Sequence, residues 1–300
     1  MPSLIAELPL VGAGGEPVDL RRTLASHGVA SLPPQRLDEE AWTLETTLAT
    51  GRGARTVRIS AGRDGHAAVE ALSGSVRVRE GEALLRTVRH MLRLDDDLSA
   101  FYALAADDAD LAWVTDGAGR MLRSPTVFED VVKTVCTTNC AWSATERMVA
   151  ALVDNLGTPA RDGRRAFPSP EAMAEADESF YRDVARAGYR GPYLRTLAAA
   201  VASGDVDLEA LADPELPEDE VAARLLALPG VGPYAAAHVM TTALGRYRRL
   251  ILDSWTRPTY AKLNGRKAAD RTIERRFRRY GEYAGLAFWL FLTRGWVPAA

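Results

Sequence analysis

The chain of 300 residues lacks the features of secreted, membrane-spanning and low-complexity proteins. It has only two cysteines, so no disulfide framework is indicated, and residues 1–15 show no basic segment followed by an apolar core. No apolar run approaches the roughly 20 residues that cross a bilayer. Lysine is also scarce, since only Lys133, Lys262 and Lys267 occur among 37 basic residues, and few amines are therefore present for covalent chemistry. We expect a cytoplasmic protein without a membrane partner.

The composition is that of a large folded protein. A hydrophobic fraction of 47% and a charged fraction of 26% exclude a disordered chain. Residues 42–48, 56–60 and 66–72 alternate between apolar and polar side chains, and turns containing glycine separate these segments. This spacing predicts a small antiparallel sheet.

Helical periodicity replaces alternation after Glu80. Beyond a first helix there, we predict helices over residues 125–139, 143–155, 170–176, 179–187, 192–203, 217–227, 233–244, 254–263, 268–280 and 283–293. The sequence therefore predicts an α+β protein that is mostly α. A β domain over residues 1–80 would pack on a helical body over residues 81–300.

Charge is separated along the chain, although the formal net charge is only −3. Residues 205–220 hold eight carboxylates and no lysine or arginine. Residues 245–280 hold twelve basic side chains against three acidic ones, a local charge of +9. A partner responds to the local field rather than to the net charge, so the basic run favours a polyanion such as nucleic acid.

The sequence LPGVGPY at 228–234 lies between two amphipathic helical stretches. Its glycines permit a tight turn or a close approach by another molecule, and Pro233 suits the first turn of a helix. A helix N-terminus that follows glycines binds anions through its free amides. The segment therefore predicts a clamp for a backbone phosphate, although an ordinary connection between two helices would use the same residues.

A carboxylate follows 19 residues after Tyr234. Asp253 comes directly after the apolar residues Leu250, Ile251 and Leu252 and before a predicted helix. Taken alone, an acid in this position is most simply a helix N-cap. Together with the hairpin, however, it forms the pattern of a known superfamily of enzymes.

The chain resembles the helix-hairpin-helix (HhH-GPD) superfamily of DNA glycosylases, most closely its 8-oxoguanine and 3-methyladenine (alkylpurine) branches. The resemblance covers most of the chain after about residue 90, with the helix-hairpin-helix at about 217–245. It rests on further matches in the same order: LRLDDDL at 92–98 followed by Phe101 and Tyr102, GRMLR at 119–123, CTTN at 136–139, GYRGPY at 188–193 and YGEYAGLA at 280–287.

The resemblance implies a role for each matching residue. Asp253 matches the catalytic aspartate, whose ionised carboxylate stabilises positive charge on the sugar and orients water. Gly230, Gly232 and Tyr234 match positions that bind a DNA phosphate, and Asn139 matches the wedge that fills the space left by the flipped nucleotide. The alternative role for Asn139 is a helix C-cap. The resemblance also implies that the carbonyls of Leu226, Leu228 and Val231 hold a structural monovalent cation.

Three departures from the family pattern define the expected chemistry. Tyr234 stands where bifunctional members carry the lysine that forms a Schiff base, so the nucleophile is expected to be water. Phe288 and Leu292 stand where the oxoguanine branch has a glutamine and an aromatic residue. With Trp142 and Trp255 they would form an aromatic pocket for electron-poor alkylated purines, although a buried helix face has the same spacing. Cys136 and Cys140 are too few for an iron–sulfur cluster and are interpreted as buried thiols.

We therefore expect a monofunctional enzyme of base excision repair, similar to DNA-3-methyladenine glycosylases. It would flip a damaged purine, alkylated or deaminated, out of double-stranded DNA and hydrolyse the N-glycosidic bond. No cofactor is expected beyond the cation, and the protein is expected to be a monomer that associates with the nucleoid when it acts. Two alternatives remain: a bifunctional 8-oxoguanine glycosylase and AP lyase, and a non-catalytic hairpin module that only binds DNA.

Overall fold

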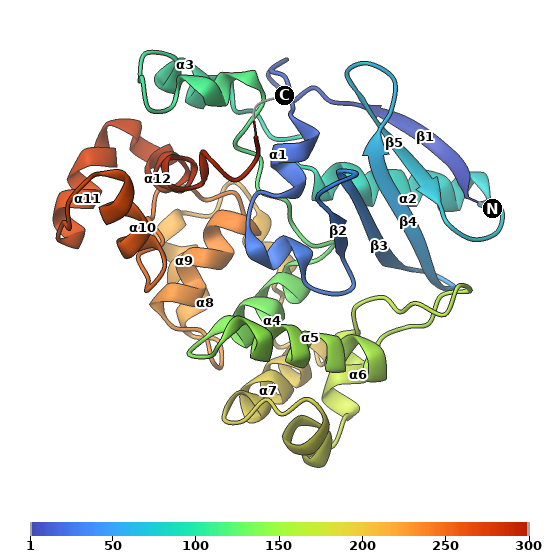
Figure 1. Cartoon of the computed structure of the whole chain (residues 1–300). Coiled ribbons are helices and arrows are strands. Elements are labelled where there is room, and N and C mark those ends of the chain that lie inside the picture. The colour runs from blue at the N-terminus through green and yellow to red at the C-terminus, as the bar shows by residue number, and fades with distance from the viewer. Residues whose placement is uncertain (1, 299–300) are drawn as a thin grey trace.

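A computed structural model of the chain describes residues 2–298 and has an α+β architecture (Figure 1). One antiparallel sheet lies at one side of the molecule, and helices form the rest. The strand order is β1-β5-β4-β3-β2. The strands are β1 (Ser3–Pro9), β2 (Arg36–Asp38), β3 (Thr43–Thr50), β4 (Gly53–Ala61) and β5 (His66–Ala71). The predicted fold class is thus confirmed.

The three alternating segments form the centre of the sheet, as predicted. Strand β4 pairs with β3 and β5, and Leu44 lies opposite Ile59, so that the apolar side chains of one face meet. The sequence analysis missed the two edge strands. Strand β1 carries an apolar run without clear alternation and ends at Pro9, and β2 has only three residues, too few to show a period.

The helices follow the predicted order. They are α1 (Leu20–Leu24), α2 (Val78–Met91), α3 (Ser99–Ala106), α4 (Val127–Thr137), α5 (Trp142–Leu156), α6 (Pro170–Glu175), α7 (Arg190–Ala202), α8 (Glu218–Leu226), α9 (Pro233–Thr242), α10 (Thr256–Leu263), α11 (Asp270–Phe277) and α12 (Ala284–Thr293), joined by shorter helical turns. None of the helices in residues 2–298 is long and apolar enough to cross a membrane.

Three helical segments differ from the prediction, and the first is α1, whose five residues are too few to show a period. The segment Phe180–Val184 is a π-helix, because the Ala185 amide donates to the Phe180 carbonyl five residues earlier. Helix α3 was not predicted, since it is apolar nearly all round and shows no polar face to define a period.

Helix α2 packs beside β1 and shares the core of the sheet. Leu84, Val88 and Met91 are buried with strand residues such as Leu44 and Val69. The sheet core therefore continues through α2, beyond residue 80, and the domain limit at 80 stays a prediction based on periodicity alone.

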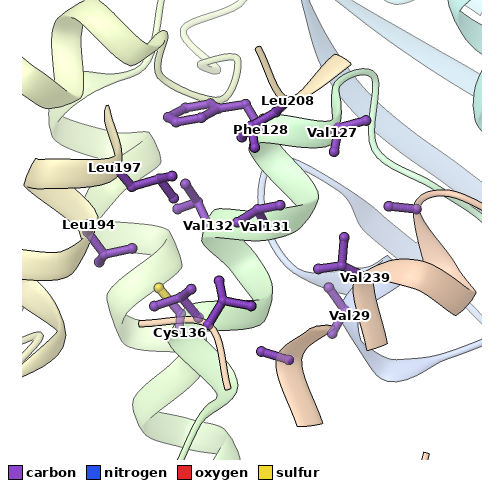
Figure 2. Packing of buried hydrophobic residues seen from close by; sticks show 14 of the residues in the cluster. Val29, Val127, Phe128, Val131, Val132, Cys136, Leu194, Leu197, Leu208 and Val239 are labelled. Carbon is purple, nitrogen blue, oxygen red and sulfur yellow. The ribbon is translucent and has the colours of Figure 1, made fainter. Parts of the chain in front are cut away.

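The helical body has two hydrophobic cores. Helix α4 is central to the first, where its buried residues contact side chains of α7 and α9 (Figure 2). Val29, from the segment that precedes β2, points into the same core and ties the sheet to the helices. Helices α3, α10, α11 and α12 form the second core. Tyr234 of α9 packs against both cores and so marks the boundary between them.

Candidate nucleic-acid interface and catalytic site

The hairpin predicted from LPGVGPY joins α8 to α9. The Val231 amide donates to the Leu228 carbonyl at 3.2 Å, which closes the turn, and Pro233 takes the first helical position. Gly232 is the N-cap and has no side chain to bond the amides of the first turn. The N-terminus of α9 therefore presents free N–H groups to an anion.

The two glycines of the hairpin have different physical roles. Gly230 has a φ of +78°, and a Cβ there would lie 3.1 Å from the Tyr193 side chain. Gly232 has a φ of −96°, and a Cβ there would meet nothing within 4 Å. The fold therefore requires glycine at position 230, whereas at 232 only an approaching ligand would require it.

Alanine substitutions should separate these two roles. We expect Gly230→Ala to lower the free energy of unfolding by about 1–2 kcal/mol, because alanine is strained at this φ. We expect Gly232→Ala to leave stability unchanged but to weaken duplex DNA binding about tenfold, because the methyl group stands where a phosphate approaches. Urea unfolding and fluorescence anisotropy measure the two effects. Wild-type DNA affinity in Gly232→Ala would show that no phosphate binds at this turn.

Asp253 lies at the start of the segment leading into α10. Its Oδ1 accepts hydrogen bonds from the amides of Trp255 at 2.8 Å and Thr256 at 2.7 Å, and its own amide donates to Thr256 Oγ1 at 2.8 Å. Among residues 2–298, no hydrogen bond uses Oδ2. Asp253 thus caps the turn that leads into α10, although Trp255 holds the N-cap position of the helix itself, and this cap uses only one of the two carboxylate oxygens. The other oxygen is held in a fixed direction and left without a protein partner.

Asp253 lies within electrostatic reach of α9. Burial raises the pKa of the Tyr234 phenol, and the negative charge of Asp253 adds to that rise. Burial lowers the pKa of His238 to about 4, although Asp253 acts in the opposite direction. His238 follows Tyr234 by one turn, with ring centroids 5.9 Å apart. No local motif in the sequence places His238 near Asp253.

The turn after α4 approaches the same region from the other side. Thr137 Oγ1 lies 3.5 Å from the Tyr234 hydroxyl, and Asn139 follows two residues later with an exposed side chain and a φ of +46°. Buried Arg190 donates to the Thr138 carbonyl and holds this turn in place. Arg190 thus fixes the backbone next to Asn139, whose side chain is exposed.

Two exposed tyrosines connect Asn139 to the hairpin. The Asn139 amide nitrogen donates to the Tyr189 hydroxyl at 3.3 Å, and the Tyr189 and Tyr193 rings meet edge to face at 6.2 Å. Tyr193 in turn lies against Gly230. Tyr189 is 53% exposed and Tyr193 is 42% exposed, which is unusual for rings of this size. The sequence analysis noted GYRGPY at 188–193 but assigned it no role. Two aromatic residues at a glycine-flanked helix start were the available signal.

The four predicted pocket residues separate into two pairs. Trp142 and Trp255 reach the surface, with 43% and 39% of each side chain exposed. Phe288 and Leu292 lie inside α12, whose residues are all buried, and Phe288 packs against the rings of Tyr260 and Phe277. A base could contact these two only if the second core opened, so their pocket role stays a prediction that this arrangement does not favour.

None of the three lysines lies beside Asp253 as a free amine. Lys133 is fully buried, and its Nζ lies 2.6 Å from Glu129 Oε1 and donates to Gln35 Oε1 at 2.5 Å and to the Leu32 carbonyl. Lys262 and Lys267 lie at the surface near the far end of α10. A lysine bound to this many partners, or placed at the opposite end of a helix, is poorly suited to attack a sugar at Asp253.

The two cysteines are free thiols near the end of α4. Cys136 is buried in the first core, where burial raises its pKa to about 12. Cys140 is partly buried and donates to the Cys136 carbonyl. Within residues 2–298, no cluster of three or more histidine, cysteine or acidic side chains is arranged to hold a metal ion.

Part of the basic run forms ion pairs at the protein surface. Arg248 and Arg249 form ion pairs with Glu218 and Asp219 at 3.5 and 2.8 Å, and Arg246 donates to the Asp213 carbonyl. Two of the eight carboxylates in the acidic segment at 205–220 therefore pair with the beginning of the basic run. After Lys262, Arg276 and Arg279 pair with Asp110 and Asp108. The residues of this part of the run without an ion pair within residues 2–298 are Arg266, Lys267, Arg271, Arg275 and Arg278.

The fold described above is shared with solved DNA glycosylases. The 3-methyladenine DNA glycosylase of Archaeoglobus fulgidus matches 98% of this chain and 100% of its own, with a TM-score of 0.73 and 21% identity. The 8-oxoguanine glycosylase/lyase of Clostridium acetobutylicum matches 93% of this chain and 94% of its own, with a TM-score of 0.70 and 18% identity. These matches confirm, at the level of the fold, the resemblance found in the sequence.

Comparison of sequences gives shorter matches. The provisionally named DNA-3-methyladenine glycosylase YfjP of Bacillus subtilis is 28% identical over 106 residues, which are 35% of this chain and 34% of that protein. The provisionally named transcriptional activator and DNA repair enzyme AlkA of Mycobacterium tuberculosis is 31% identical over 163 residues, which are 52% of this chain and 32% of that protein. The chain thus spans about a third of the length of these curated relatives. No family model matches the chain.

Proposed function

We propose that this protein is a monofunctional DNA glycosylase that removes damaged purines, alkylated or deaminated, from double-stranded DNA. The observation that carries the proposal is the carboxylate of Asp253, fixed through Oδ1 and unpartnered at Oδ2, beside the hairpin helix α9. The names of the relatives support the same reading, since two are 3-methyladenine glycosylases and one is a DNA repair enzyme.

The carboxylate serves the chemistry because cleavage of an N-glycosidic bond develops positive charge on the sugar. A fixed negative oxygen stabilises that charge and orients the attacking water. His238 helps by staying neutral, since a pKa of about 4 leaves it uncharged at neutral pH. A cation in its place would pair with Asp253 and weaken the field that acts on the sugar.

The proposed DNA contacts follow from the surface around the site. The amides at the start of α9, with Gly230 and Gly232 shaping the turn, hold a backbone phosphate. Asn139 enters the duplex where the nucleotide leaves, and the exposed ring of Tyr189 beside it stacks on a neighbouring base. The exposed rings of Trp142 and Trp255 would contact the flipped purine.

A structural monovalent cation fits the hairpin. Within residues 2–298, no backbone hydrogen bond ends on the carbonyls of Leu226 or Val231, and the Leu228 carbonyl keeps a second lone pair beside its bond to Val231. Carbonyls left unpaired at a turn are suitable ligands for such an ion. Bound there, it would stabilise the turn that presents the phosphate-binding amides.

The bifunctional alternative is disfavoured by the side chain at 234. We expect no covalent trapping of the protein on lesion-containing duplexes in the presence of borohydride, because Tyr234 has no amine to form a Schiff base. The duplexes tested each carry one lesion: hypoxanthine, ethenoadenine, an alkylated purine or 8-oxoguanine. The 8-oxoguanine glycosylase/lyase of C. acetobutylicum serves as the positive control for trapping. Strands should break only after alkali. Trapping, or breakage without alkali, would favour the bifunctional alternative, and tight binding without breakage would favour the non-catalytic one.

A further inference from the structure

A basic basin lies between α10 and α11, apart from the hairpin and Asp253. Its volume is about 750 Å³, and its basic lining residues are Arg266, Lys267, Arg275 and Arg276. The other lining residues are neutral, so no carboxylate offsets these charges within the lining. A concave surface with one sign of charge concentrates the field on a ligand that enters it.

One of the four cations, Arg276, is held by contacts within the protein, and the other three remain available to a ligand. Arg276 donates to Asn264 Oδ1 at 2.9 Å and to Asp110 Oδ2 at 2.7 Å, and its guanidinium lies 4.3 Å from the centre of the Phe291 ring. It therefore fixes the floor. Arg266, Lys267 and Arg275 are exposed and form no ion pair within residues 2–298. They are three of the seven residues of the basic run that form no ion pair within residues 2–298.

The wall adds a second feature that favours anions. Ala268 and Ala269 line the basin, and Ala269 is the N-cap of α11 without a side chain that bonds the first amides. The positive end of the helix dipole therefore opens beside the three free cations. Asp270, in the first turn, is occupied by an ion pair with Arg257 at 2.8 Å and does not cancel them.

The position of the basin relative to Asp253 suggests the ligand. Helix α10 has eight residues, so at 1.5 Å per residue it spans about 12 Å between the Asp253 end and the basin end. Duplex DNA rises 3.4 Å per base pair, so about 12 Å corresponds to three or four base pairs. A duplex whose damaged nucleotide reaches Asp253 would bring backbone phosphates to this distance.

From this geometry we infer that the basin is a second phosphate-binding site, which holds the DNA backbone at least three or four base pairs from the flipped nucleotide. The inference extends the proposed function, since it rests on DNA as the substrate. It assigns to Arg266, Lys267 and Arg275 a role in duplex affinity and none in bond cleavage, because none of them approaches Asp253.

The test compares a triple variant with a charge-matched control. The variant is Arg266→Gln, Lys267→Gln and Arg275→Gln, and the control is Arg52→Gln, Arg79→Gln and Arg86→Gln, three exposed arginines at the sheet and α2. Undamaged 24-base-pair duplexes are bound over a series of salt concentrations. Loss of three phosphate contacts should lower the slope of log affinity against log salt by about 2–3, while the control keeps the wild-type slope.

Duplex length and competition identify the source of the phosphate. Extending the duplex from two to eight base pairs on each side of a central position should raise wild-type affinity more than that of the triple variant. Inorganic phosphate at millimolar concentration should not remove this difference, because a single ion cannot replace a backbone. Equal slopes in the triple variant and the wild type, or a length dependence that is the same in both, would overturn the inference.

These measurements read binding rather than turnover, so the two proposals fail separately. If the wild-type protein releases no base but the triple variant lowers the slope of log affinity against log salt, the phosphate site in the basin is supported and the proposed glycosylase activity is contradicted. If the wild-type protein releases base but the triple variant has the wild-type slope, the glycosylase activity is supported and the phosphate site in the basin is contradicted. Single-turnover cleavage at saturating DNA should be the same in the triple variant and in the wild type.

Discussion

Replacement of Asp253 by asparagine should lower the rate of base release by about 100- to 1,000-fold or more, the usual effect of removing one fixed group that stabilises transition-state charge. Asparagine keeps an oxygen that can accept from the amides of Trp255 and Thr256, so the cap and the fold should survive. Duplex affinity should also survive, because loss of a negative charge does not weaken contacts with phosphates. Single-turnover kinetics and anisotropy measure the two quantities.

Asp253→Ala provides the matched control for the structural role of this side chain. It removes both the charge and the cap, so the free energy of unfolding should fall by about 1 kcal/mol, whereas Asp253→Asn should change little. If both variants lose turnover but only alanine loses stability, the charge is required for chemistry. Wild-type turnover in Asp253→Asn would mean that the residue acts only as a helix cap.

The second large effect concerns a buried pair of histidines behind the site. The rings of His27 and His238 meet edge to face at 5.9 Å, where the segment preceding β2 packs on α9. Burial lowers the pKa of His27 to about 3 and that of His238 to about 4, and the proximity of His238 adds to the effect on His27. Both are therefore neutral in the folded protein above about pH 4.

Acid should destabilise the protein through this pair. Unfolded histidine has a pKa of about 6.5, so between pH 6.5 and 4 the unfolded chain binds more protons than the folded one, and stability falls as the pH falls. Between pH 6.5 and 5 each histidine should contribute a loss of about 2 kcal/mol. Asp130 acts in the opposite sense, because burial raises its pKa to about 6, and it should restore about 1.4 kcal/mol between pH 6 and 5.

We therefore expect the wild-type protein to lose at least about 3 kcal/mol of stability between pH 7 and 5 in urea unfolding experiments, since His90, whose burial also lowers its pKa to about 4, adds to the loss from the pair. The double variant His27→Gln and His238→Asn removes both titrating groups while placing an amide near each nitrogen that now contacts Leu122 or Thr242. Its stability should change much less over this range, because His90, whose burial lowers its pKa to about 4, then acts against Asp130. Parallel stability curves for the two proteins would show that the histidines are not held neutral by the fold.

The order of the elements could be predicted from the sequence because their signals are local. Alternation located β3, β4 and β5, and apolar periods with Pro125, Pro170, Pro217 and Pro233 located the helices that follow them. The hairpin and the capping carboxylate were also predictable, because both are specified by a few neighbouring residues.

The remaining features depend on contacts between distant residues, which a single sequence does not encode in any local pattern. The pairing of Arg248 with Glu218 removes charge that the sequence appeared to offer to a ligand, and His27 meets His238 from another part of the chain. Likewise, the apolar spacing of Phe288 and Leu292 is the same for a pocket wall and for a core helix. The choice between them depends on what α10 and α11 cover.

The most direct test of the central claim is to identify what the protein releases from DNA. Duplex DNA treated with a methylating agent is incubated with the wild-type protein and, separately, with the Asp253→Asn variant. The released bases are then separated and identified by mass spectrometry. The account predicts that the wild-type protein releases methylated purines as intact bases and that the variant releases almost none. If the wild-type protein binds this DNA but releases no base from it, or from DNA carrying deaminated purines, the proposed function is contradicted.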